Sequence, residues 1–105
     1  MARIVRQGTI KIGEAKPEEL IIKNFGEASS TFSIQVDNGS VSLKAKHRNN
    51  YDTEEIYPLA MIDMSNFNTV KTATNGLFMT VLDGIDEIDM EVSGAGEINW
   101  QELGD

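Results

Sequence analysis

Few side chains in this sequence could support catalysis. The 105 residues contain one histidine, His47, and no cysteine, so thiolate nucleophiles and metal sites built from several histidines are excluded. A Ser-His-Asp set can be assembled only by combining Ser40 or Ser42 with His47 and Asp52. A working triad holds its serine on a sharp turn, often within a Gly-x-Ser-x-Gly motif, and the sequence has no such motif. We therefore predict that the protein is not an enzyme and has no catalytic residues.

Acidic residues are more numerous, and four of them, Asp83, Asp86, Glu87 and Asp89, lie close together. Their spacing lacks the alternating oxygen ligands and the final glutamate of an EF-hand loop. The simpler interpretation is that these residues form a solvated acidic strand. The alternative is a calcium site of less regular geometry at a turn. A glycosidase pair of carboxylates would need a sugar-binding cleft lined by aromatic residues, and the chain has only one Trp, two Tyr and four Phe. We expect no required metal and no cofactor.

The overall charge narrows the choice of partner. With 17 acidic against 9 basic residues, the formal net charge is −8, which disfavours binding to nucleic acid or to an anionic membrane surface. The acidity either keeps the protein soluble or forms a face that docks on a cationic partner. No apolar run approaches the ~20 residues of a transmembrane helix, and residues 1–7 lack the continuous apolar core of a signal peptide. We expect the protein to be made in the cytoplasm.

Two pairs of alternating segments predict β-hairpins. Apolar residues alternate with polar ones in 32–36 and again in 41–45, and the Asn-Gly dipeptide between these segments is typical of a tight hairpin turn. In residues 87–92, apolar side chains alternate with acidic ones, and the apolar pattern resumes after a glycine-rich turn at 93–97. A sheet with one apolar face needs a second layer to cover that face.

About eight short segments of this kind, with turn signals roughly every 8–12 residues, predict an all-β fold. We expect a single-domain antiparallel β-sandwich of the jelly-roll or immunoglobulin-like type, with residues 29–105 as its core. Residues 1–28 alternate less regularly and are predicted to form an N-terminal strand or arm that contacts a neighbouring subunit. In 77–82 the alternation is ambiguous, because Phe78, Thr80 and Leu82 form a rival apolar face. The side chains predicted to be buried are Phe32, Ile34, Val36, Leu43, Leu77, Val81, Ile88, Met90, Val92 and Trp100.

Two groups of charged residues are candidates for an interface. Residues at i and i+2 share one face of a strand, so each group forms a row. Like charges in one row repel mildly, which indicates either an edge strand protected from aggregation or a cationic partner, and for the acidic group we favour the edge. We expect the basic group to meet an acidic strand of another subunit. The basic group is Lys44, Lys46 and Arg48, and the acidic group is Glu87, Asp89 and Glu91.

From residue 32 onward, the order of the predicted elements resembles that of small virion proteins of tailed bacteriophages. The resemblance rests on the hairpin at 32–45, a Tyr-Pro-Leu segment at 57–59, a Gly-Leu-Phe strand at 76–78 and a Val-Ser-Gly-x-Gly turn at 92–96. The chain departs from that pattern in its acidic strand at 87–91, where basic or neutral residues are common in those proteins. This departure bears directly on any partner surface inferred from the resemblance.

The resemblance implies a non-enzymatic structural protein of the virion, namely a capsid decoration or cement protein. Such proteins bind the major capsid protein on the head surface, stabilise the head and typically form trimers. Under this interpretation the protein is made in the host cytoplasm, forms a homo-oligomer on the capsid surface, and extends residues 1–28 onto the capsid or a neighbouring subunit. The alternative is a carbohydrate-binding or host-adhesion module of a phage head or tail fibre, for which exposed Tyr51 and Tyr57 would be the signal.

Overall fold

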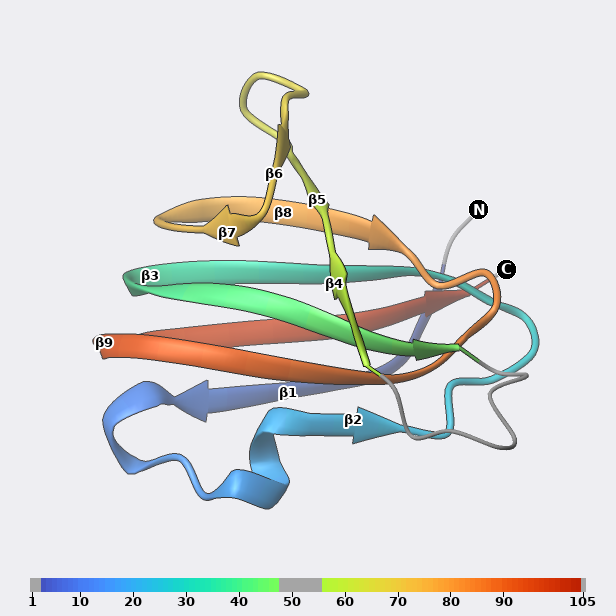
Figure 1. Ribbon diagram of the computed structural model, residues 1–105, viewed down its shortest axis with the longest axis horizontal. Helices are drawn as coiled ribbons and strands as arrows, with labels where there is room; N and C mark the ends of the chain where they lie inside the picture. Colours follow the sequence, from blue (N-terminus) through green and yellow to red (C-terminus); the bar gives the residue numbers. More distant parts are fainter. Residues whose placement is uncertain (1–2, 48–55, 105) are drawn as a thin grey trace.

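The computed structural model describes residues 3–47 and 56–104, which form an almost entirely β structure (Figure 1). Two short 3-10 helices, η1 (Ile12–Glu14) and η2 (Pro17–Leu20), lie between the first two strands. No helix in the described ranges is long and apolar enough to cross a membrane. The strands are β1 (Arg3–Lys11), β2 (Ile21–Lys23), β3 (Ser29–His47), β4 (Tyr57–Leu59), β5 (Met61–Asp63), β6 (Thr69–Val70), β7 (Thr72–Ala73), β8 (Gly76–Val81) and β9 (Ile85–Gly104).

All nine strands belong to one antiparallel sheet. The order along its main path is β1-β9-β3-β8-β5-β6, while β2 also pairs with β9, and β4 and β7 also pair with β3. The prediction of an all-β antiparallel chain is confirmed. In place of the two separate sheets of a sandwich, continuous hydrogen-bond ladders join the strands into a single sheet that is not closed into a barrel.

The two longest strands, β3 and β9, determine the shape of this sheet. They pair with each other almost end to end, from Ser29 opposite Gly104 to His47 opposite Ile85. Both strands double back at the same place (Figure 1), where Gly39 faces Gly94 and the pairing register shifts. A Cβ atom on Gly94 would lie 2.8 Å from the Cα atom of Gly39. Glycine is therefore needed at this corner because the two backbones approach too closely for any side chain.

Each predicted hairpin is therefore one bent strand. Segments 32–36 and 41–45 are the two halves of β3, and each half pairs with β9 instead of with the other half. Segments 87–92 and 98–100 are related in the same way within β9. The turn residues do reverse the chain, as predicted. Because the partner strand reverses at the same place, the hydrogen bonds stay between β3 and β9, and the turns form a corner of the sheet.

One contiguous cluster of buried side chains takes residues from both halves of β3 and of β9, so the inner faces of the two halves of the sheet face each other across it. The buried apolar positions are even-numbered before the corner of β3, as at Phe32 and Ile34, and odd-numbered after it, as at Val41 and Leu43. A bend with a shifted register produces this change of parity, since it adds one residue to the alternation.

Most of the predicted core is confirmed. Phe32, Ile34, Val36, Leu43, Ile88 and Met90 are buried, and Val92 and Trp100 are half-buried against the same cluster. The prediction is wrong in β8, where Leu77 and Val81 are 47% and 62% exposed and the rival face of Phe78, Thr80 and Leu82 is buried. The reason is register: Phe78 lies opposite Ile34 of β3, which fixes the inward face of β8. Residues 77–82 are apolar on both faces of the strand, so the sequence alone does not indicate which face of β8 is buried.

The N-terminal segment contributes two strands at the margins of the sheet. β1 pairs with the second half of β9 and β2 with its first half, so both lie beside β9 on the side away from β3. The predicted division between residues 1–28 and 29–105, and the contact of the first segment with another molecule, stay predictions.

Candidate interaction surfaces

The residues of the hypothetical triad do not come together in the described part of the chain. The Ser40 hydroxyl lies 2.6 Å from that of Ser93, and the Ser42 hydroxyl lies 2.9 Å from that of Thr72. His47 is five residues beyond Ser42 on the same strand, a separation of roughly 16 Å at the usual rise per residue. Asp52 lies outside the described residues.

The clustered carboxylates do not form a metal site in the described structure either. Within residues 3–47 and 56–104, no three carboxylate, imidazole or thiol groups are placed to hold one ion. The four acids at 83–89 are divided between the turn after β8 and the start of β9, where alternate residues point to opposite faces.

The predicted basic and acidic groups lie opposite one another on one outer face of the sheet. Lys44 faces Asp89 and Lys46 faces Glu87 across the β3–β9 ladder. The Lys44 Nζ atom is 2.6 Å from Oε1 of Glu91, one position further along. We call this surface the charged face, and it consists of Lys23, Lys44, Lys46, Glu87, Asp89 and Glu91. Arg48, the third member of the predicted basic group, lies outside the described residues.

The expectation that the acidic row marks a sheet edge is wrong for Glu87 and Asp89. At these two residues β9 lies between β2 and β3, with Ile21 opposite Asp89 on one side and Lys44 opposite it on the other. Lys23 of β2 also places its Nζ atom 3.7 Å from Oε1 of Glu87. The cations that face the acidic row therefore come from neighbouring strands of the same chain. Contact of this face with a partner stays a prediction.

The charged face carries three lysines and three acids, but two of its acids, Glu87 and Asp89, crowd each other. The pKa of Glu87 is raised, first by burial and then by a hydrogen bond and charge repulsion from Asp89, while Lys23 and Lys46 act in the opposite direction. One carboxylate oxygen of Asp89 is buried without a hydrogen-bond partner in the described structure. A proton or an additional cationic group near this pair of acids would therefore be favourable.

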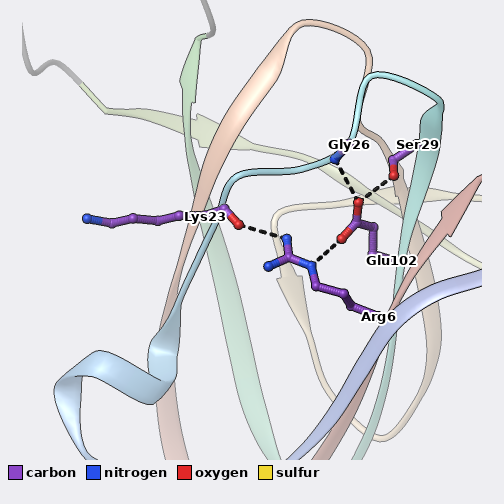
Figure 2. A network of polar contacts seen from close by, with 5 residues as sticks. All are labelled: Arg6, Lys23, Gly26, Ser29 and Glu102. Carbon is purple, nitrogen blue, oxygen red and sulfur yellow. Dashed lines mark hydrogen bonds and ion pairs between the residues drawn. The ribbon is translucent and has the colours of Figure 1, made fainter.

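A second polar cluster lies inside the fold, around Glu102 of β9 (Figure 2). This side chain is fully buried, and its carboxylate accepts hydrogen bonds from Arg6 Nε at 2.5 Å, from the Gly26 N–H at 2.9 Å and from the Ser29 hydroxyl. Arg6 in turn donates to the carbonyl oxygen of Lys23 at 2.7 Å. The network ties β1, the segment after β2, the start of β3 and the end of β9 to one buried carboxylate.

The environment of Glu102 keeps its carboxylate ionised. Burial acts to raise the pKa of Glu102, but hydrogen bonds from Ser29, Gly26 and Arg6, together with the positive charge of Arg6, outweigh it, and the pKa is lowered. Sequence reasoning missed this residue because it looks like one more acid in an acidic segment. Its parity with buried Ile98 was the available signal.

The other outer face of the sheet has a different character. Three rows of residues cross β1, β9, β3 and β8 on the side away from the core, and the middle row continues onto β5. None of these side chains is charged. Several apolar members are well exposed, including Val81 at 62% and Ile4 at 50%. We call this surface the uncharged face. Its rows are Ile4, Leu103, Thr31 and Val81; Gln7, Gln101, Ser33, Met79 and Ile62; and Thr9, Asn99, Gln35 and Leu77.

The uncharged face continues into an apolar groove beside the turn that follows β5. The groove encloses about 300 Å³ and is lined by Thr31, Ile62, Met64, Phe67, Met79, Thr80 and Val81. Phe67 is 74% exposed and has a φ of +61°, which is an unusual backbone conformation for an aromatic residue. Hydrogen bonds hold the turn in this form, since the N–H groups of Asn66 and Phe67 both donate to the carbonyl oxygen of Asp63. Sequence reasoning missed this surface because it assigned Leu77 and Val81 to the core.

Of the two aromatic residues relevant to a glycan site, only Tyr57 lies in the described structure. It belongs to β4, opposite Ala45, and is 56% exposed. Tyr51 lies outside the described residues.

The fold is similar to those of two solved structures, one of which is of a prophage-derived protein. No protein-family model matches the chain, and no curated protein matches it in sequence. Among solved structures, the fold is similar to SPBc2 prophage-derived protein YomS, with a TM-score of 0.60 and 10% identity over 99% of this chain and 94% of that one. It is also similar to the PBSX exported protein XepA, with a TM-score of 0.64 and 10% identity over 94% of this chain. The matched region is 38% of the length of XepA.

Proposed function

We propose that this chain is a non-enzymatic structural protein of a tailed-phage particle, which binds the major capsid protein on the head surface and stabilises the head. The single observation that carries the proposal is the contrast between the two outer faces of the sheet, one charged and one uncharged. A decoration protein needs a surface for the capsid and another for its own copies. The similarity of the fold to a prophage-derived protein supports a phage origin.

In this proposal the charged face contacts the capsid. Its crowded pair Glu87 and Asp89 favours an additional cation, and Lys44 and Lys46 offer positive charge to an acidic partner. The protein acts as a homo-oligomer, with three copies as in the proteins it resembles, and residues 1–28 assist the contact with the capsid or with a neighbouring subunit. In this proposal, the two halves of the bent sheet serve as the two layers of a jelly-roll or immunoglobulin-like sandwich, and the layers are joined at the corner.

The test is binding to purified heads that lack the protein, measured by co-sedimentation. We expect saturable binding that weakens as salt concentration rises, because charged contacts carry it. Lys44→Glu should weaken binding by at least about tenfold, equivalent to about 1.4 kcal/mol. Lys71→Glu changes the net charge equally, but Lys71 is an exposed residue between β6 and β7 that belongs neither to residues 1–28 nor to the charged face, so this variant should bind as the wild type does.

Absence of binding, or binding that Lys44→Glu and Lys71→Glu reduce equally, would contradict the proposal. Recovery of the protein from tails instead of heads would contradict its placement on the capsid. Exposed Tyr57 favours the alternative function, a carbohydrate-binding or host-adhesion module. Specific binding on a glycan array that Tyr57→Ala abolishes would replace the capsid role with that alternative.

A further inference from the structure

The absence of charge from the uncharged face is unusual for this protein. Charged residues make up 25% of the chain, so thirteen positions chosen at random would include about three. The next row across the same strands, at the corner, is charged and consists of Lys11, Glu97 and Asp37. Depletion of charge with retention of apolar and amide side chains is the composition found at the centre of protein interfaces.

The size of the face suits a reversible protein contact. At normal strand spacing, the thirteen positions of this face cover about 400 Å², and the projecting side chain of Phe67 adds about 150 Å². A standard interface buries about 800 Å² on each partner. The face with its adjoining groove therefore provides most of one standard interface, while the groove supplies an apolar recess and Phe67 an aromatic anchor at its margin.

The net charge of the chain indicates which partner binds the uncharged face. A cationic or dipolar partner would gain from acidic side chains at its docking site, and this face offers none. A second copy carries the same net charge of −8, so contact through any acidic surface would bring like charges together. On the uncharged face, two copies can approach without placing one carboxylate against another.

We propose that the uncharged face is the contact between copies of this chain, with Val81, Ile62 and Leu77 forming its apolar part and Phe67 entering the neighbouring copy. This inference takes from the proposed function only that the chain forms a homo-oligomer. It adds which surface the copies share. Salt screens the repulsion between two chains of charge −8 and leaves apolar contact intact. Self-association therefore strengthens with salt, whereas head binding through the charged face weakens.

Sedimentation velocity of the full chain, without heads, tests this proposal from about 1 µM to about 500 µM, a range that brackets micromolar affinity. We expect a reversible oligomer of two or three copies that is tighter at high than at low salt. Val81→Lys places a charge at the most exposed of the large apolar side chains in the rows, and Gln35→Lys places one in the polar part without removing apolar area. Each should weaken association by at least about tenfold.

Tyr57→Lys is the matched control, because Tyr57 is 56% exposed, similar to Val81 at 62%, but lies on β4. It should associate as the wild type does, and circular dichroism should show that all three variants are folded. A wild-type chain that stays monomeric throughout the range, or Lys variants that associate unchanged, would overturn the proposal. Failure of head binding alone would overturn the capsid role and leave this contact standing.

Discussion

Replacing Glu102 with alanine removes the one acceptor shared by three donors. The N–H of Gly26 and the hydroxyl of Ser29 lose their partner in a buried site, and Arg6 loses its counter-ion. Breaking a buried ion pair by removing one partner costs about 3–5 kcal/mol, and the Arg6 side chain, 39% exposed, can recover part of its hydration. We therefore expect Glu102→Ala to reduce the free energy of unfolding by about 3 kcal/mol.

Thermal and urea unfolding followed by circular dichroism measure this loss. For a chain of this size, about 3 kcal/mol corresponds to a fall in Tm of roughly 10–20 °C. Glu91→Ala is the matched control, since Glu91 forms an ion pair with Lys44 in which both side chains are well exposed, and it should cost no more than about 1 kcal/mol. If Glu102→Ala costs no more than Glu91→Ala, the structural role of the buried network is refuted.

The pH dependence of stability gives a second readout of the same residue. The fold lowers the pKa of Glu102, so its contribution is complete above the unfolded-state pKa and is lost as pH falls through the folded-state value. The difference in stability between wild type and Glu102→Gln should be largest near neutral pH and shrink below about pH 4. A difference that is constant with pH would show that the charge of Glu102 does not matter.

Two further predictions concern the corner of the sheet and the charged face. Gly96→Ala would force a Cβ atom into the carbonyl oxygen of Asp37 and should destabilise the fold by at least about 2 kcal/mol. The control is Gly13→Ala, which places its Cβ atom in open space and should cost less than about 1 kcal/mol. Urea unfolding measures both losses. Glu87→Gln should stabilise the protein by about 0.5 kcal/mol near neutral pH. The raised pKa of Glu87 means that its favourable contribution is present at low pH and lost as pH rises through the folded-state value, so the gain should vanish in acid. Equal unfolding midpoints for the two glycine variants, or a loss of stability in Glu87→Gln at neutral pH, would contradict these assignments.

The alternation of residues was enough to predict the strands, because a pleated strand with one buried face requires period two. It also located the turns at 37–40 and 93–97. What it could not predict was the partner of each segment. An Asn-Gly turn between two alternating runs normally forms a hairpin, and here a second glycine-rich turn in β9 lies opposite it. Pairing between residues that lie from 38 positions apart (His47 and Ile85) to 75 positions apart (Ser29 and Gly104) depends on the whole fold, so local sequence does not specify it.

The candidate surfaces were predictable to different degrees. The basic and acidic rows were identified from spacing, but their mutual pairing followed from the β3–β9 register. The uncharged face depends on the inward face of β8, and its run Leu77–Val81 is apolar at nearly every position. Burial of Glu102 depends on Arg6, almost the length of the chain away, so no local pattern indicates it.

A reconstruction by electron cryomicroscopy of heads with the protein added back tests the central claim most directly. The account predicts additional density on the outer surface of the head, with copies of the bent sheet touching through the uncharged face and the charged face turned to the major capsid protein. Heads whose surface is unchanged at saturating protein, or density in which the uncharged face is open to solvent, would contradict it.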